Sequence, residues 1–199
     1  VGLYASLAET STGLGLVFYD RTEGNLYGAA EDGGTWGEPF LIDGYGVGDS
    51  FIGDSGIGAS LAVDASDVWH VTYVDGAEET LRYARVEGGT VTTEIVDNGT
   101  TDGSTAHDDG RHLIGDDSAV AVTDGGEVRV AYQDATAGRA MFARRGGDGS
   151  WTISIADEGD FSGFFTDQVL VGGTSFVATW WRNDSEDNRG NGVRVVSID

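Results

Sequence analysis

The residues best suited to bind an ion lie in one acidic stretch, residues 100–117. Its candidate ligands are two histidines and four of its five aspartates: His107, Asp108, Asp109, His112, Asp116 and Asp117. Carboxylate oxygens suit Ca²⁺, and imidazole nitrogens suit Zn²⁺. The stretch lacks an ordered ligand motif such as D-x-D-x-D-G or H-E-x-x-H. Two interpretations therefore stay open: a Ca²⁺ site at Asp108, Asp109, Asp116 and Asp117, or a solvated acidic loop.

A second set of polar residues stands at equivalent positions of a repeat that is described below. Its members are Ser6, Ser60, Ser118 and Asp167. Each opens the first strand of its repeat, so in a closed ring of repeats they would surround one mouth of a central channel. They are predicted to bind water, an ion or a small ligand there, or to make structural hydrogen bonds. The sequence offers no Ser-His-Asp set, because His70 lies within a strand and is interpreted as a core histidine.

The repeat is clearest between Ser60 and Gly99. Four short segments rich in β-branched or aromatic residues are each followed by Asp, Gly or Asn. The predicted strands are Ser60–Val63, Val68–Tyr73, Leu81–Val86 and Val91–Val96. About forty residues with four strands is the size of one β-propeller blade.

The same pattern recurs along the chain. Asp20, Asp75 and Asp134 end the second strand of three units, at spacings of 55 and 59 residues. The predicted units cover residues 1–44, 56–99, 115–159 and 166–199, within one propeller domain over residues 1–199. In the last unit Asn183 replaces the aspartate and the fourth strand is missing. We predict an all-β protein, a β-propeller of four-stranded antiparallel blades, about four in number with the last incomplete, or an arc of a larger propeller.

Two repeated positions have predicted roles. The strand-ending aspartates can accept hydrogen bonds from the N–H groups of the following turn, and a ring of metal ligands is the alternative. One aromatic position is shared by Phe18, Tyr73, Tyr132 and Trp181. Packing between blades explains these rings, and a platform for sugar stacking is the other interpretation.

Composition limits the partners. The chain of 199 residues has 34 acidic and 11 basic residues, a formal charge of −23, with no cysteine. Such a charge repels nucleic acids and anionic membranes. No apolar run approaches about 18 residues, so membrane insertion is not expected. We expect a secreted, extracellular or cell-surface protein.

Four sequence patterns resemble a known family. S-L-A-x-D at Ser60–Asp64, V-x-Y-x-D at Val71–Asp75, L-x-Y-A at Leu81–Ala84 and G-G-x-W at Gly33–Trp36 are similar to bacterial β-propeller repeats of the sialidase-like, BNR or Asp-box kind. Residues 148–151 (D-G-S-W) resemble a shortened Asp-box, which in the family stabilises a turn. The resemblance covers most of the chain as a repeat.

The enzymes of that family, the sialidases, use three arginines, a tyrosine nucleophile with a glutamate partner, and an acidic proton donor. No arginine trio can be placed in this sequence, since Arg82, Arg85, Arg111 and the pair Arg144–Arg145 are not at blade starts. An enzyme is therefore not favoured, although the question stays open.

The missing fourth strand suggests how the protein could work. It could be closed by the chain's own beginning, supplied by another polypeptide, or belong to a longer propeller. The first hypothesis is a non-enzymatic binding or assembly module for a protein or glycan partner, or for a second copy of itself. The alternatives are a sialidase-like glycoside hydrolase and a Ca²⁺-dependent carbohydrate-binding lectin.

Overall fold

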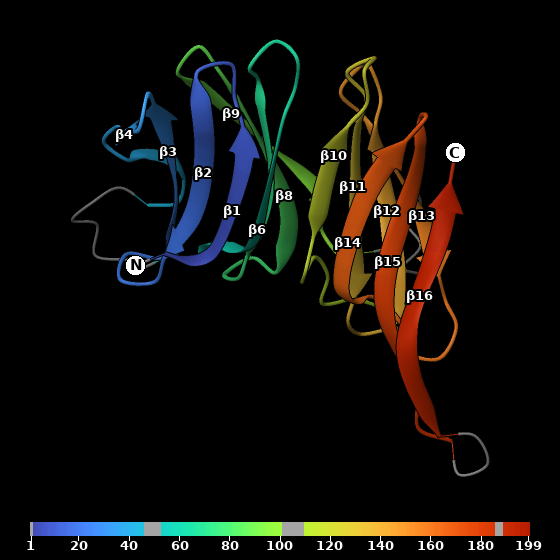
Figure 1. Ribbon diagram of the computed structural model, residues 1–199. Coiled ribbons are helices and arrows are strands. Elements are labelled where there is room, and N and C mark those ends of the chain that lie inside the picture. Colours follow the sequence, from blue (N-terminus) through green and yellow to red (C-terminus); the bar gives the residue numbers. More distant parts are fainter. Residues whose placement is uncertain (1, 46–52, 101–109, 186–188) are drawn as a thin grey trace. The chain divides into compact units, whose positions relative to one another are not determined.

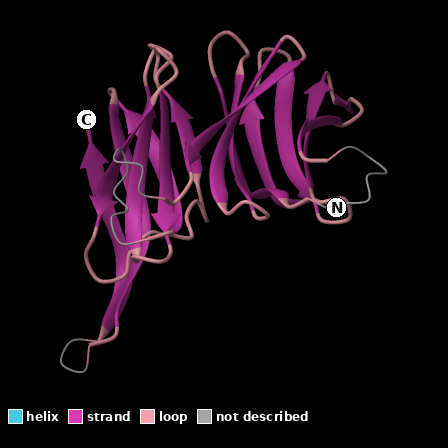
Figure 2. Ribbon diagram, turned by 180° about the vertical axis from the view of Figure 1, so that it is seen from behind, coloured by secondary structure: helices cyan, strands magenta, loops and turns pink. Residues whose placement is uncertain are grey.

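The computed structural model describes residues 2–45, 53–100, 110–185 and 189–199. These residues form sixteen strands in four antiparallel sheets and contain no helix (Figure 1, Figure 2). None of the described segments is a helix long and apolar enough to span a membrane. The predicted fold class is confirmed: the chain is all-β, and its four sheets are propeller blades.

Contacts between residues divide the chain into two compact units, Val1–Val96 and Asp97–Asp199. The first unit holds the first two sheets, and the second unit holds the last two. The grouping of residues 1–199 as a single propeller domain stays a prediction.

The first sheet has an interrupted outer strand. Its members are β1 (Leu3–Glu9), β2 (Gly13–Asp20), β3 (Asn25–Asp32), β4 (Thr35–Trp36) and β5 (Phe40–Asp43). Both β4 and β5 pair with β3. Pro39, the only proline of the chain, lies between them and has no N–H to donate to the ladder. The two short strands together therefore take the place of the fourth strand of this sheet.

The second sheet confirms the four predicted strands of the clearest repeat. It consists of β6 (Ser55–Val63), β7 (Trp69–Asp75), β8 (Thr80–Glu87) and β9 (Thr90–Asp97), in that order. The turn between β8 and β9 is Gly88–Gly89, with φ angles of 55° and 81°. Both residues have a left-handed backbone conformation, as a type I′ two-residue hairpin turn requires.

The second unit repeats this order and ends one strand short. Its third sheet contains β10 (Ala119–Val122), β11 (Val128–Asp134), β12 (Arg139–Arg145) and β13 (Trp151–Asp157). Its fourth sheet contains β14 (Phe164–Val171), β15 (Thr174–Asn183) and β16 (Gly190–Ile198). The prediction of three strands in the last unit is confirmed for the described residues.

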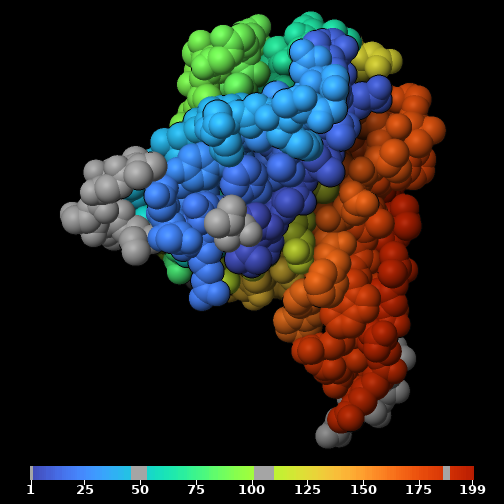
Figure 3. All heavy atoms as spheres, turned by 60° about the vertical axis from the view of Figure 1, so that its left-hand side comes forward, coloured from blue at the N-terminus to red at the C-terminus, as the bar shows by residue number. Residues whose placement is uncertain are grey.

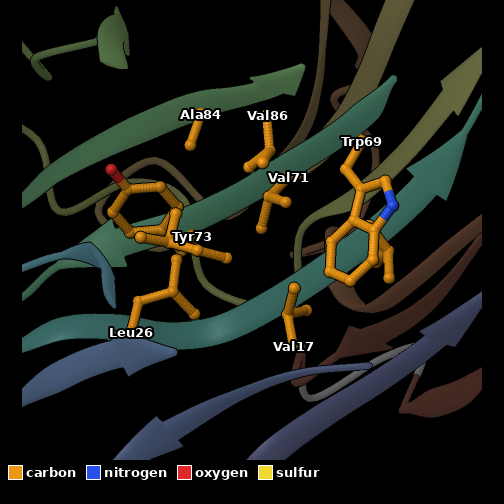
Figure 4. Close-up of a cluster of buried hydrophobic side chains, with 9 residues drawn as sticks. Val17, Leu26, Trp69, Val71, Tyr73, Ala84 and Val86 are labelled. Atoms are coloured by element: carbon orange, nitrogen blue, oxygen red, sulfur yellow. The ribbon is translucent and has the colours of Figure 1, made fainter. Parts of the chain in front are cut away.

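Within each unit the two sheets pack face to face through apolar side chains. In the first unit, Val17 and Leu26 of one sheet meet Val71 and Tyr73 of the other, and all four are fully buried (Figure 4). Every residue of β7 is buried, so both of its faces are covered. This explains why the sequence of β7 shows no clear alternation of apolar and polar residues. In the second unit Phe142 and Val177 form the corresponding contact.

The strand-ending residues make the predicted turn contacts. They are Asp20, Asp75, Asp134 and Asn183. In each, a side-chain oxygen accepts a hydrogen bond from the N–H two or three residues later, at 2.8–3.0 Å. The structural interpretation of these positions is thus confirmed. The D-G-S-W turn behaves likewise, because Asp148 accepts hydrogen bonds from both the N–H and the hydroxyl of Ser150.

Candidate functional site

The four residues predicted to surround a channel mouth are split between the two units. Ser6 of β1 and Ser60 of β6 belong to the first unit, on strands that pack side by side. The Ser6 hydroxyl accepts a hydrogen bond from Leu61 N–H at 3.0 Å, so it joins two blades. In the second unit Ser118 is buried, whereas Asp167 is exposed. Ligand binding by these four residues stays a prediction.

The strand register corrects the predicted equivalence of two members. Asp167 pairs with Ala178, which lies five positions before Asn183, and Ser118 is displaced as well. Ser6 and Ser60 each pair with the residue three positions before the aspartate that ends the next strand. In the third sheet Ala119 holds that place, so Ser118 is one residue out of step. Ser118 itself precedes β10, which begins at Ala119, so it is not the structural counterpart of Ser6 and Ser60. The sequence alignment erred because Ser118 and Ala119 are both small and adjacent.

The predicted Ca²⁺ ligands are only partly visible. Asp108 and Asp109 lie outside the described residues. Burial and the neighbouring Asp117 raise the pKa of Asp116. The Asp117 carboxylate accepts a hydrogen bond from Phe165 N–H at 3.0 Å. No group of three potential metal-binding side chains occurs within the described ranges, and Ca²⁺ binding at these aspartates stays a prediction.

The two described histidines of interest are both buried. His70 is 5% exposed, and its Nδ1 lies 2.7 Å from the hydroxyl of Tyr83, which confirms the core interpretation. His112 is 3% exposed, and its Nδ1 lies 2.6 Å from the carboxylate of the fully buried Asp134. One histidine of the acidic stretch, His112, is therefore buried in the protein interior.

An arginine and a tyrosine, two residue types of a sialidase centre, are engaged in contacts with other side chains of the first unit. Arg82 contacts three carboxylates, those of Asp43, Asp75 and Glu78, at 3.6, 3.3 and 2.6 Å. Tyr73 donates a hydrogen bond to Asp43, is fully buried, and has a pKa raised by that burial. A buried phenol with a raised pKa is a poor nucleophile. This cluster stabilises the first unit through these internal contacts.

A pocket in the second unit gathers exposed chemical groups from three loops. It has a volume of about 400 Å³. The loops follow β11, β13 and β15, and the lining residues are Ala137, Gly138, Glu158, Asp160, Phe161, Arg182, Asn183, Asp184 and Ser185. All three loops begin at the same end of their sheets, where the strand-ending aspartates lie. The pocket is therefore built on the repeated turns themselves.

The loop that follows β13 holds an unusual backbone. Asp160 and Phe161 have φ angles of 57° and 48°, two consecutive left-handed residues of which neither is glycine. Arg182 N–H approaches both of their carbonyl oxygens, at 3.0 and 3.1 Å. Such conformations cost energy and tend to occur at binding sites. No pattern in the sequence predicted left-handed conformations at Asp160 and Phe161.

Side-chain contacts hold this loop from below. Asn183 Nδ2 donates to the Asp160 carboxylate at 2.6 Å. Arg194 of β16 bridges Asp157 and Asp160, at 2.6 and 3.3 Å. The hydrogen bond from Arg194 to Asp157 raises the pKa of the guanidinium, so its positive charge is secure. The Asp160 carboxylate therefore serves mainly to hold the loop in place, since Asn183 and Arg194 already bind it.

The Phe161 ring is the exposed apolar surface of the pocket. Its side chain is 55% exposed. Gly138 lies beneath it, and a Cβ atom at Gly138 would come within 2.4 Å of the ring. The absence of a side chain at position 138 thus lets the ring pack closely against the β11–β12 turn.

Charged groups surround this ring. Arg182 forms an ion pair with Asp184 at 2.6 Å, and both side chains are more than half exposed. Glu158 has no ion pair or side-chain hydrogen bond within the part of the chain that the structure describes. An aromatic face beside a guanidinium and free carboxylate oxygens suits a molecule with an apolar face and a hydroxylated edge.

A second pocket, in the first unit, is chemically simpler. It has a volume of about 450 Å³ and is lined by Phe40, Leu41, Asp67, Trp69, Val86, Gly88, Gly89 and Val91. The only ionisable residue among these lining residues is Asp67. Its carboxylate accepts hydrogen bonds from the N–H and the hydroxyl of Ser11. This pocket offers few polar groups that could orient a ligand.

Comparison with known proteins identifies the fold and nothing finer. Neither a protein-family model nor a curated protein sequence matches the chain. An α-L-arabinofuranosidase from Clostridium thermocellum is similar in structure, with a TM-score of 0.58 and 10% identity over 98% of this chain and 68% of the other. The chain has a β-propeller fold. At this identity the likeness extends to the fold alone.

Two further solved structures are similar. An ulvan lyase has a TM-score of 0.55 and 12% identity, over 92% of this chain and 46% of the other. A subtype N10 neuraminidase-like protein of influenza A from a little yellow-shouldered bat has a TM-score of 0.53 and 12% identity, over 98% of this chain and 58% of the other. The chain thus spans about half the length of these two structures. The sialidase-like resemblance of the repeats agrees with a propeller fold.

Proposed function

We propose that this protein is a non-enzymatic, secreted or cell-surface β-propeller that binds a glycan in the pocket beside Phe161. The observation that carries the proposal is the exposed Phe161 ring, held on a strained backbone among hydrogen-bonding side chains. A sugar ring has an apolar C–H face and a rim of hydroxyls. The aromatic surface suits the face, while Glu158 and Arg182 suit the rim.

The similar structures support a glycan as the ligand. By their names, these proteins are an α-L-arabinofuranosidase, a lyase that acts on ulvan, and a xylan β-1,4-xylosidase from Bacillus halodurans. Propellers of this shape therefore include several proteins named for polysaccharides. A protein partner remains the other proposed ligand class, and the acidic surface makes nucleic acid an unsuitable one.

The pocket favours binding over hydrolysis. Glycoside hydrolysis uses two carboxyl groups on opposite sides of the scissile bond, about 5–10 Å apart. Of the three acids in the pocket, Asp160 is bonded to Asn183 and Arg194, and Asp184 is paired with Arg182. Glu158 is then the single carboxylate that a ligand meets without displacing a partner.

A glycoside hydrolase is the second candidate, because the pocket does contain three carboxylates. A ligand that displaced Arg182 from Asp184 would free a second one. A Ca²⁺-dependent lectin is the third, and it depends on Asp108, Asp109, Asp116 and Asp117 of the acidic stretch, of which the first two lie outside the described residues. The tests below separate these three possibilities.

The decisive experiment compares two phenylalanines. The wild-type protein, Phe161→Ala and Phe165→Ala are titrated by calorimetry with xylo-, arabino- and sialyl-oligosaccharides. Phe165 is the matched control, since it is 74% exposed, has a φ angle of 50° and lies outside the pocket. We expect Phe161→Ala to weaken binding at least about tenfold and Phe165→Ala to leave it unchanged.

Four outcomes would contradict the proposal. Equal loss in both variants would place the ligand elsewhere. Release of reducing sugar that disappears in Glu158→Gln would establish the hydrolase. Loss of binding with EDTA, restored by Ca²⁺, would establish the lectin. Absence of binding to every oligosaccharide would leave a protein as the partner.

A further inference from the structure

The apolar pocket of the first unit has a wall of two aromatic rings. Phe40 of β5 and Trp69 of β7 have ring centroids 5.7 Å apart, with their planes tilted by 49°. Both rings line the pocket, whose volume of about 450 Å³ lies in the usual range of small-molecule sites. Figure 3 shows the light-blue segment around β4 and β5 next to the green hairpin of β8 and β9, the elements that border this pocket.

Two glycines of the first sheet let these rings pack closely. A Cβ atom at Gly15 would lie 2.8 Å from the Trp69 indole, and one at Gly28 would lie 2.6 Å from the Phe40 ring. On the other side, Trp69 pairs in register with Val86 of β8, which also lines the pocket. Trp69 and Val86 are each only 7% exposed. The aromatic wall is therefore held in place before any ligand arrives.

A single carboxylate, that of Asp67, lies at this pocket. Asp67 belongs to the turn between β6 and β7 and has a φ angle of 59°, which aspartate adopts more readily than most residues. Its Oδ1 atom accepts a hydrogen bond from the Ser11 N–H at 2.7 Å, and its Oδ2 atom accepts one from the Ser11 hydroxyl. Ser11 lies in the turn between β1 and β2, so two turns from different sheets fix the carboxylate.

The charge of Asp67 is not balanced within the part of the chain that the structure describes. Glu87, which precedes the β8–β9 turn, forms an ion pair with Arg85 at 2.6 Å. Asp64, in the same turn as Asp67, lies 3.4 Å from the ring of His70. Asp67 has hydrogen bonds to Ser11 and no ion pair among the described residues. A cation in the pocket would supply the missing charge, and the net charge of −23 attracts cations.

We propose that this pocket binds a small organic cation that carries a trimethylammonium group. Aromatic faces attract such cations, and the methyl groups suit the apolar lining. Both Asp67 oxygens already accept hydrogen bonds, so the carboxylate contributes mainly its charge. A quaternary ammonium has no N–H group and requires no acceptor, whereas a primary ammonium would lose hydrogen bonds to water on entry.

This site lies in the first unit and goes beyond the proposed glycan site, which lies in the second. The test is calorimetry on the full chain at about 0.15 M salt, which screens long-range attraction. Three probes are compared: choline, its neutral isostere with carbon in place of the nitrogen, and ethanolamine, which carries a primary ammonium. Choline should bind at least about tenfold more tightly than either of the others.

The variant that tests the carboxylate is Asp67→Asn, which should weaken choline binding at least about tenfold. Asp148→Asn is the matched control. Asp148 is also an exposed turn aspartate that accepts hydrogen bonds from the N–H and the hydroxyl of a serine, Ser150. Its replacement changes the net charge equally but lies in the second unit. It should alter choline binding by less than about twofold.

Four results would overturn the proposal. Equal loss in Asp67→Asn and Asp148→Asn would show that choline responds only to the net charge. Equal affinity for the neutral isostere would show an apolar cavity without charge selection. Ethanolamine binding as tightly as choline would show that Asp67 acts as a hydrogen-bond acceptor. Absence of saturable choline binding would exclude the site. Phe161→Ala should bind choline like the wild type, so failure of the glycan site and failure of this site are distinguishable.

Discussion

The Tyr73 hydroxyl donates a hydrogen bond of 2.5 Å to the Asp43 carboxylate, which ties the second blade to the last residue of the first. Within the second unit, the fully buried Tyr132 likewise donates a hydrogen bond to the Asp97 carboxylate, at 2.7 Å. Asp43 and Asp97 are both the final residues of an outer strand. At Tyr73 and Tyr132 the repeated aromatic residue is therefore buried and also donates a hydrogen bond to an aspartate. We call each of these tyrosine–aspartate hydrogen bonds a latch. Packing alone did not predict the latch, because packing does not require the hydroxyl.

Removal of one latch should destabilise the protein measurably. Tyr73→Phe leaves the Asp43 carboxylate without its donor, so we expect the free energy of unfolding to fall by about 1–3 kcal/mol in urea titrations. The control is Tyr27→Phe, which removes a hydrogen bond of 2.8 Å to Glu23 at a turn. Its cost should stay below about 0.5 kcal/mol. Equal effects would show that the latch contributes no more than a turn contact.

Tyr19 should make stability sensitive to alkaline pH. Burial and a hydrogen bond to Asp54 raise the pKa of Tyr19 to about 12. A raised pKa means that the folded state favours the neutral phenol. The stabilisation is therefore complete below the unfolded pKa of about 10 and is lost as pH rises toward 12.

We expect the free energy of unfolding to fall less steeply with pH in Tyr19→Phe than in the wild type between about pH 10 and pH 12. Urea titrations at several pH values measure this difference. Identical pH dependence in the two proteins would contradict the assignment.

The backbone at Phe161 should prefer glycine. At a φ angle of 48° a side chain crowds the backbone, and glycine does not. Phe161→Gly should therefore be more stable than Phe161→Ala by about 1 kcal/mol, as measured by thermal unfolding. Both variants should lose glycan binding equally. A less stable glycine variant would show that the left-handed conformation carries no strain.

Two equivalent turn aspartates should differ in importance. Asp134 is fully buried and binds His112 in addition to its turn, whereas Asp20 serves its turn at the surface. Asp134→Ala should cost about 3 kcal/mol or more, because it removes the carboxylate that a buried imidazole binds. Asp20→Ala should cost about 1 kcal/mol. Equal urea midpoints of unfolding would contradict this difference.

Local patterns were sufficient for the strands and turns. The four predicted strands between Ser60 and Gly99 are β6 to β9, although β6 begins at Ser55. The early part of β6 was missed because Gly56 and Gly58, with φ angles of 118° and 62°, occupy an irregular stretch where β-propensity is weak. The turn role of the strand-ending aspartates was also predictable, since it depends on atoms only two or three residues away.

The candidate site could not be predicted in the same way. Glu158 and Phe161 come from the loop after β13, and Arg182 comes from the end of β15, so their meeting depends on how one blade packs on another. The acidic stretch, which attracted attention by composition, instead contributes His112 to a buried pair with Asp134. Composition recognises residue types, but it carries no information on which of them face solvent.

The sequence by itself determined the blade repeat and the strands of the second, third and fourth sheets, because strand periodicity and turn chemistry are local. Only the tertiary structure decided that Tyr73 reaches Asp43, that Ala119 and not Ser118 matches Ser60, and that Phe161 is held exposed over Gly138. These relations join residues that are far apart in the chain or differ by one step of register. They are set by the packing of two sheets, which no short stretch of sequence specifies.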